Sequence, residues 1–168
     1  MKDSGSPAAD ERCAAPDAWQ VAVRLLAVKS RSTEEIRRLL AGRGFAADAI
    51  AAAIARLTAA RYLDDAEFTR AWLASTAHQR LGPARLSRAL RVKGVPEPLI
   101  AQAMRELTAT RSPIETAADA ARRKFPSLAG LPRPVARRRL AGFLERKGFS
   151  AEIIMTLCRR HFGGDEVE

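Results

Sequence analysis

A threefold internal repeat constrains the fold of this chain more than any other feature of its sequence. Three glycines mark the repeat, at positions 44, 94 and 148, and the same kinds of residue stand at fixed distances from each of them. An aliphatic residue precedes each glycine by eight positions, a leucine by four and a base by one, while an isoleucine follows after six. A period of about 50 residues predicts copies of one structural unit joined in tandem.

Each copy has the pattern of two helices joined by a tight turn. In the first copy Ile36 and Leu40 share one helical face, and Gly44 stands where a left-handed residue ends a helix. The next helix follows after about three residues and carries Ile50 and Ile54 on one face. We expect a further helix ahead of each pair, over 19–28, 68–77 and 114–124.

Helix start signals and composition both indicate an all-α fold. Ser32, Asp64 and Ser112 are each followed three positions later by glutamate, which is the pattern of a capping box. Alanine, the strongest helix former, is the most frequent residue, whereas β-branched and aromatic residues do not alternate over a useful length. We therefore predict nine helices in three three-helix repeats, over 17–63, 64–110 and 111–162, between a disordered leader (1–16) and an acidic tail (163–168).

The small size of the repeats predicts how they are arranged. A unit of about 50 residues buries little apolar surface by itself, so neighbouring repeats should share contacts in an elongated, curved array. Inside the third repeat, Pro126, Gly130, Pro132 and Pro134 predict a longer break between helices.

The chain is strongly basic, with 29 lysines and arginines against 19 acidic residues and a net charge of +10. Such an excess attracts polyanions, of which nucleic acid is the commonest, although a basic surface that only aids solubility is the alternative. The three repeats carry charges of +4, +2 and +8, and the tail carries −3. The third repeat is therefore the strongest candidate for contact with phosphates.

Bases concentrate on the middle helix of each repeat, which favours a stripe that faces phosphates over a merely solvated helix face. Arg85, Arg88 and Arg91 recur at every third position and so share a face away from Leu86 and Leu90. The candidate contact residues are Arg37, Arg38, Arg43, Arg85, Arg88, Arg91, Lys93, Arg137, Arg138, Arg139, Arg146 and Lys147.

The helix after each turn is poorly suited to reading bases. Recognition in the major groove uses Arg, Lys, Asn or Gln near the N-terminal end of such a helix. Here the helices begin with acidic or apolar residues, over 47–50, 97–100 and 151–154. We therefore expect contact with DNA to be independent of sequence.

No residue pattern indicates catalysis, a metal or a cofactor. The chain has no glycine-rich phosphate loop, and its two histidines and two cysteines do not form a metal-binding set. Asp64, Asp65 and Glu67 could be a metal-binding cluster, but helix capping accounts for the same residues. The longest stretch without Asp, Glu, Lys or Arg, 71–79, is too short to cross a membrane, and no secretory signal is evident, so we expect a cytoplasmic protein.

Cys158 and the histidines are expected to have structural roles. Cys158 replaces Ile54 and Met104 of the other repeats, which predicts a buried thiol. His78 follows a short helix and is expected at the surface. His161 stands at a position that leucine occupies in the other repeats, and it is expected at a packed helix end.

Three segments resemble the RecX family of recombination regulators: 61–68 with its Tyr-Leu-Asp-Asp run, 82–95, and the Arg31-Ser32 start with its Gly44-Phe45 turn. The chain departs from the family at Thr69, where alanine is frequent, and in its longer leader. The resemblance implies tandem three-helix repeats and a protein that binds RecA in the helical groove of its filament on DNA. It further implies inhibition of strand exchange and ATP hydrolysis by RecA, in DNA repair, recombination and the SOS response.

Charge and resemblance lead to one mechanism. A curved basic array would lie in the filament groove as a monomer and touch phosphates with some bases and acidic protein surface with others. Binding to single- and double-stranded DNA alone would be weak and independent of sequence. Capping of a filament end and binding along the filament both remain open. The alternative function is a stand-alone DNA-binding or architectural protein with helix-turn-helix-like units, and an enzyme is not expected.

Overall fold

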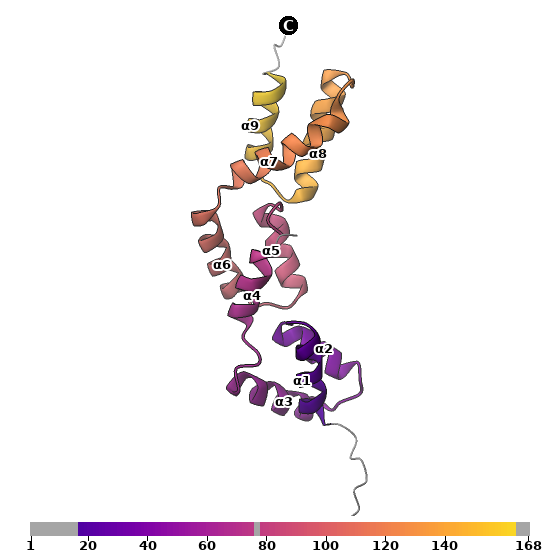
Figure 1. The fold of residues 1–168 in the computed structure, drawn as a ribbon, viewed down its shortest axis with the longest axis vertical. Coiled ribbons are helices and arrows are strands. Elements are labelled where there is room, and N and C mark those ends of the chain that lie inside the picture. Colours follow the sequence, from indigo (N-terminus) through magenta and orange to yellow (C-terminus); the bar gives the residue numbers. More distant parts are fainter. Residues whose placement is uncertain (1–16, 76–77, 164–168) are drawn as a thin grey trace, which may run out of the picture.

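The computed structural model describes residues 17–75 and 78–163. Within these ranges the chain forms nine α-helices and one 3₁₀ turn with no β-strand, so the all-α prediction is confirmed. The helices form three groups that follow one another along the long axis in an elongated, curved array (Figure 1). The predicted leader, 1–16, and residues 164–168 of the predicted tail lie outside the described residues.

Each group holds three helices in chain order, as predicted. Repeat 1 contains α1 (Ala18–Val28), α2 (Thr33–Ala41) and α3 (Ala47–Ala59). Repeat 2 contains α4 (Asp65–Ala74), α5 (Pro83–Val92) and α6 (Glu97–Thr110). Repeat 3 contains α7 (Pro113–Lys124), α8 (Arg133–Lys147) and α9 (Ala151–Phe162), and the 3₁₀ turn η1 (Phe125–Leu128) lies in the predicted break between α7 and α8. We refer to α2, α5 and α8 as the middle helices.

The three repeat glycines terminate the middle helices in the predicted way. Gly44, Gly94 and Gly148 have φ angles of 83°, 75° and 87°, the left-handed conformation that glycine adopts without a steric cost. After each glycine, the N–H of the next residue donates to the carbonyl of the leucine four positions before the glycine, at 3.1 to 3.3 Å. This bond satisfies a carbonyl group that the helix end would otherwise leave without a partner.

One of the three predicted capping boxes is complete. Ser32 Oγ accepts a hydrogen bond from the Glu35 N–H at 3.1 Å, and Glu35 Oε2 accepts one from the Ser32 N–H at 3.2 Å. Asp64 and Ser112 cap their helices with their side chains. The glutamates three positions later form no reciprocal bond within the described part of the chain, so these two boxes are half-formed.

The first helix of repeat 2 differs from its predicted bounds of 68–77. It begins at Asp65, because the Asp64 side chain accepts hydrogen bonds from the N–H groups of Ala66 and Glu67 at 2.8 and 2.9 Å. It ends at Ala74, and positions 76 and 77 lie outside the described residues.

Each repeat has a hydrophobic core of its own. In repeat 1, Ile36 and Leu40 of α2 pack with Leu57 of α3, and all three side chains are fully buried. The equivalent residues of the other middle helices are also fully buried: Leu86, Leu90, Leu140 and Leu144. The three cores remain separate clusters. Neighbouring repeats do share contacts, and the hydrogen bonds and ion pair between them include several at the ends of the middle helices. Arg111 of repeat 3 also donates to the Gln79 carbonyl of repeat 2 at 3.0 Å.

Candidate nucleic-acid interface

The middle helices of repeats 1 and 2 meet end to end. Ser32 Oγ, at the start of α2, donates a hydrogen bond to the carbonyl of Lys93, at the end of α5, at 2.5 Å. The Lys93 ammonium group lies 2.9 Å from Glu35 Oε1. The Thr33 N–H donates to Asp65 Oδ1 at 2.8 Å, so a carboxylate of repeat 2 satisfies a free N–H of α2.

The middle helices of repeats 2 and 3 meet in the same way. The Gly82 N–H, at the start of α5, donates to the carbonyl of Lys147, the last residue of α8, at 2.8 Å. Arg85 Nη1 donates to the carbonyl of Arg146 at 2.6 Å. The approach is close, because a Cβ on Gly82 would lie 2.2 Å from the carbonyl oxygen of Gly148.

These junctions arrange the middle helices in one head-to-tail row, in the order α8, α5, α2 (Figure 1). At each junction the C-terminal carbonyl groups of one helix face the N-terminal end of the next, so the partial charges of the two helix ends attract each other. The basic middle helices of all three repeats are thereby brought into one continuous row.

A groove crosses both junctions of this row and encloses about 740 Å³. Side chains from all three repeats line it: Glu35, Arg38, Arg85, Arg88, Ala89, Val92, Lys93 and Arg146. Five of these are contact candidates predicted from the sequence, and they come from three different helices. We refer to this feature as the basic groove.

The cations of the basic groove fall into two classes. Arg38, Arg85 and Lys93 bond to the protein itself, and Arg38 Nη1 donates to the Val92 carbonyl at 3.0 Å. The side chains of Arg88 and Arg146 form no hydrogen bond or ion pair with any residue in 17–75 or 78–163. The first class therefore holds the junctions together, and the second is available to an external anion.

A second basic depression adjoins the groove on repeat 3. It encloses about 480 Å³ and is lined by Lys124, Arg138, Arg139, Gly142 and Arg146. No acidic residue is among the described residues that line it, and Arg146 is common to both features. Lys124 was not among the sequence candidates, although the run of bases at 122–124 in the last turn of α7 signals it. We refer to this depression as the basic hollow.

The other five candidates lie outside both features: Arg37, Arg43, Arg91, Arg137 and Lys147. Arg91 binds both carboxylate oxygens of Glu97 at 2.7 and 2.8 Å, so the predicted arginine stripe of α5 contributes Arg85 and Arg88 to the groove but not Arg91. Arg37 pairs with Glu34 at 2.6 Å. These contacts direct the two arginines toward neighbouring carboxylates.

Acidic residues beside the groove are held in their charged form. Burial raises the pKa of Glu35, but hydrogen bonds from Lys93 and the Ser32 N–H outweigh burial and leave this pKa below its ordinary value. The hydrogen bond from Arg37, assisted by Arg38, lowers the pKa of Glu34 despite some desolvation. The junction ion pair is therefore intact at neutral pH.

Two of the three carboxylates at the start of α4 cap helices, and the third forms an ion pair. Asp64 caps α4, Asp65 caps α2 across the junction, and Glu67 pairs with Arg70 at 2.8 Å. The described residues contain no group of three His, Cys, Asp or Glu side chains placed to hold a metal ion.

Cys158 is buried as expected, whereas both histidines differ from prediction. Burial raises the pKa of the Cys158 thiol above its ordinary value, which favours the protonated, less nucleophilic form. His78 is half-buried, because its ring stacks on Trp72 with centroids 3.6 Å apart and its Nδ1 lies 2.7 Å from the Trp72 carbonyl. His161 is exposed, and its ring contacts Phe125 edge-on. This end of α9 is therefore not packed at position 161.

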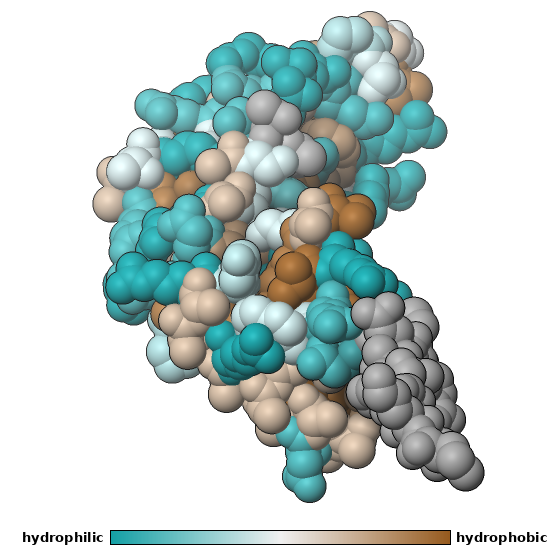
Figure 2. Space-filling view, turned by 60° about the horizontal axis from the view of Figure 1, so that its bottom comes forward, coloured by the Kyte–Doolittle hydropathy of each residue, from teal (hydrophilic) through white to brown (hydrophobic). Residues whose placement is uncertain are grey.

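The face shown in Figure 2 is largely polar. In Figure 2, where repeat 1 comes forward, hydrophilic side chains predominate and apolar ones form small groups. The large apolar side chains that are exposed among the described residues are Val28, Tyr62, Val92 and Met155. No helix in the described ranges is both long and apolar enough to span a bilayer.

Comparison with known proteins identifies the repeats. Models of the first, second and third three-helix domains of RecX match residues 18–57, 64–104 and 113–157. The regulatory protein RecX of Amycolatopsis mediterranei is 33% identical over 152 residues, which cover 88% of this chain and 86% of that protein. RecX of Streptomyces coelicolor is 34% identical over 141 residues, covering 83% and 74%. The crystal structure of RecX from Lactobacillus salivarius superposes with a TM-score of 0.73 at 19% identity, covering 85% of this chain and 93% of that one.

Proposed function

The chain belongs to the RecX family of regulatory proteins, and from this membership we infer that it binds RecA and RecA filaments on DNA and inhibits strand exchange and ATP hydrolysis by RecA. It would thereby regulate DNA repair and recombination without catalysing a reaction of its own. We propose that it acts in the cytoplasm and as a monomer.

The observation that carries this proposal is the basic groove across all three repeats. A filament on DNA offers phosphates and acidic side chains along its length, and a ligand in the groove would meet Arg88 of repeat 2 and Arg146 of repeat 3 at once, beside the junction cations of repeats 1 and 2. Individually modest contacts then add up, because each one after the first forms at high effective concentration. The head-to-tail row fixes the spacing of these cations before binding, which lowers the ordering cost.

The basic hollow supports a contact with DNA phosphates. Four cations line it without an acidic neighbour, and neither Arg138 nor Arg139 is paired with another described residue. Arginine and lysine side chains bind phosphates irrespective of base sequence. Binding to single- and double-stranded DNA through this hollow should therefore be weak and non-specific.

The test is DNA-dependent ATP hydrolysis by RecA of the same host, measured with and without the purified chain. We expect the intact chain to lower the rate and Arg88→Glu to weaken this effect several-fold, because the reversed charge faces the groove. Arg105→Glu is the matched control, since Arg105 is exposed on α6 outside the groove. Equal loss in both variants, or no inhibition by the intact chain, would contradict the proposal.

The second candidate function is a stand-alone, sequence-independent DNA-binding or architectural protein, which the all-cation lining of the hollow favours. Such a protein could slow RecA only by competing for DNA. Inhibition that vanishes when DNA is in large excess over the chain would indicate this function, whereas inhibition that persists would indicate contact with RecA.

A further inference from the structure

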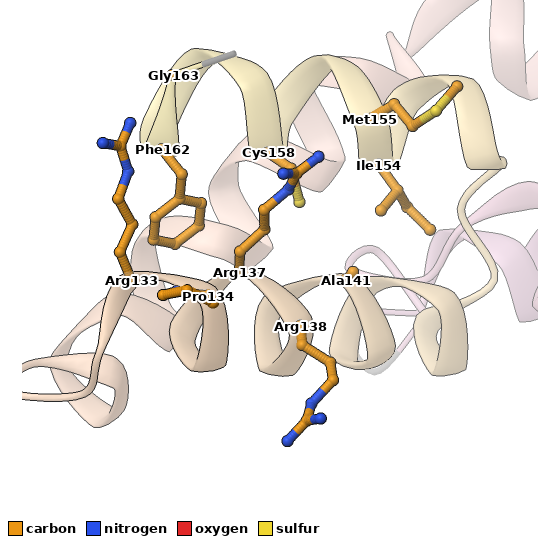
Figure 3. Close-up of a pocket in the computed structure, with 10 residues that line it drawn as sticks. All are labelled: Arg133, Pro134, Arg137, Arg138, Ala141, Ile154, Met155, Cys158, Phe162 and Gly163. Atoms are coloured by element: carbon orange, nitrogen blue, oxygen red, sulfur yellow. The ribbon is translucent and has the colours of Figure 1, made fainter. Parts of the chain in front are cut away.

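A cleft between α8 and α9 of repeat 3 shares only Arg138 with the basic hollow and no residue with the basic groove. It encloses about 870 Å³ and is lined by Arg133, Pro134, Arg137, Arg138, Ala141, Ile154, Met155, Cys158, Phe162 and Gly163 (Figure 3). We refer to it as the terminal cleft. We propose that residues 164–168 of the same chain, Gly-Asp-Glu-Val-Glu, dock into the terminal cleft and compete there with DNA phosphates.

The floor of the cleft is apolar and open to solvent. Ile154 and Phe162 of α9 point toward Ala141 and Pro134 of α8, whereas Met155 lies at the rim and extends away from α8 (Figure 3). Met155, at the rim, is 56% exposed and so leaves apolar surface open to a ligand of the cleft. A ligand with one apolar side chain would bury part of this surface.

Cations surround this floor. The side chains of Arg133 and Arg137 extend from α8 toward α9, whereas Arg138 points away from α9 (Figure 3). A ligand for the cleft therefore needs negative charges on either side of an apolar group. Residues 165–168 have this pattern, since Val167 is flanked by Glu166 and Glu168.

The tail segment starts at the mouth of the cleft. Gly163 lines the cleft, and a Cβ on it would lie 2.5 Å from Arg133 Nη2. Its φ and ψ of 73° and 165° are a conformation almost confined to glycine, and they turn the chain out of the direction of α9. The first carboxylate of the tail, Asp165, therefore follows Gly163, the residue beside Arg133, by only two positions.

The reach of the segment matches the length of the cleft. From Phe162 back to Ile154 is eight helical residues, about 12 Å. Five residues span up to about 17 Å when extended. Because the segment is tethered at Gly163, its effective concentration at the cleft is in the millimolar range, far above that of a separate peptide.

Paramagnetic relaxation measured by NMR on the full chain tests this docking. The methionine methyl groups would be labelled with ¹³C, and a nitroxide attached to a cysteine added after Glu168 in a Cys13→Ser background, which leaves Val167 in place. Cys158 is buried and out of reach of the label. We expect the Met155 methyl signal to broaden strongly and the Met104 signal of repeat 2 to stay sharp. The broadening should be lost in Arg133→Ala/Arg137→Ala, with helicity unchanged.

Two results would overturn the proposal. The first is a Met155 signal as sharp as that of Met104. The second comes from a mixture in which one chain carries the ¹³C-methionine and no nitroxide, and the other carries the nitroxide and no ¹³C. Broadening of Met155 in this mixture would mean that a second copy supplies the tail.

Competition with DNA gives an independent readout. Neutralising the tail with Asp165→Asn/Glu166→Gln/Glu168→Gln should raise affinity for single-stranded DNA at low salt several-fold. The matched control, Asp48→Asn/Glu106→Gln/Glu152→Gln, makes the same change of net charge at exposed positions elsewhere and should raise it less. An equal rise in both variants would mean that net charge alone is responsible and that the tail does not compete.

Discussion

The N–H of Gly82 donates a hydrogen bond of 2.8 Å to the carbonyl of Lys147, which joins the start of one middle helix to the end of the next. The bond from Ser32 to the carbonyl of Lys93 joins the preceding pair. Because the cores of the repeats are separate, these polar contacts between helix ends set how the repeats are placed relative to one another. The geometry of the basic groove therefore depends on the junctions.

Alanine substitutions at two repeat glycines should distinguish the stability lost at the left-handed turn from the stability lost at the junction between repeats. Gly44 and Gly148 both have positive φ, but a Cβ on Gly44 meets nothing within 4 Å, whereas one on Gly148 lies 2.4 Å from the Arg85 backbone nitrogen. We expect Gly44→Ala to cost about 1 kcal/mol for the left-handed conformation. Gly148→Ala should cost at least twice as much in urea denaturation, because the backbones must also separate. Equal losses would show that the junction is not close-packed in solution.

Replacement of Leu90 by alanine tests the separate cores. Leu90 is fully buried in the core of repeat 2, so the variant should lose about 2 to 5 kcal/mol of unfolding free energy. Val92→Ala on the same helix is the control, because this side chain is 68% exposed and its loss should change stability by less than about 0.5 kcal/mol. Native-state hydrogen exchange should show the loss in α4 to α6 and leave repeat 1 protected. A uniform loss across all helices would contradict separate cores.

The ion pair between Glu35 and Lys93 predicts a dependence of stability on pH. The pKa of Glu35 is lower in the folded chain than its ordinary value, so the pair stabilises the fold above that value and is lost as the pH falls through the folded one. Glu35→Gln retains an acceptor for the capping bond but removes the charge. We expect the variant to be less stable by about 1 kcal/mol at pH 7 and to match the parent in acid. A difference in urea denaturation that stays constant with pH would exclude the ion pair as its source.

The features predicted correctly from the sequence are those with local signals. The turn at Gly44 needs one glycine and the leucine four positions before it, and the Ser32 cap needs one glutamate three positions later. The junctions have no such signal, because Ser32 and Lys93 are 61 residues apart and their bond involves a backbone carbonyl. The pairing of Arg91 with Glu97 likewise depends on how the chain turns between α5 and α6. The sequence therefore predicted a basic middle helix in each repeat but not which bases line the groove.

The basic hollow predicts a change in the salt dependence of DNA binding. Lys124→Ala/Arg139→Ala removes two of its four cations, which should weaken binding to any DNA sequence. The slope of log affinity against log salt concentration should fall by about 1 for each phosphate contact that is lost. Arg105→Ala should leave the slope unchanged. A slope that responds equally to all these substitutions would mean that DNA contacts the whole surface rather than the hollow.

Truncation after Thr110 tests whether inhibition needs the whole array. Repeats 1 and 2 keep their own cores and the junction between Ser32 and Lys93, so the fragment should retain helical circular dichroism and unfold cooperatively. It lacks Arg146 and the entire basic hollow, and the N–H of Gly82 loses its partner on α8. We therefore expect DNA binding and inhibition of RecA to fall by at least tenfold, because the contacts that act together in the groove are reduced to those of two repeats.

The full chain carrying Arg85→Glu/Arg88→Glu should show a similar loss with all three repeats folded. Inhibition by the fragment at the concentration that suffices for the full chain would mean that a local contact, such as one with a single subunit at a filament end, is enough.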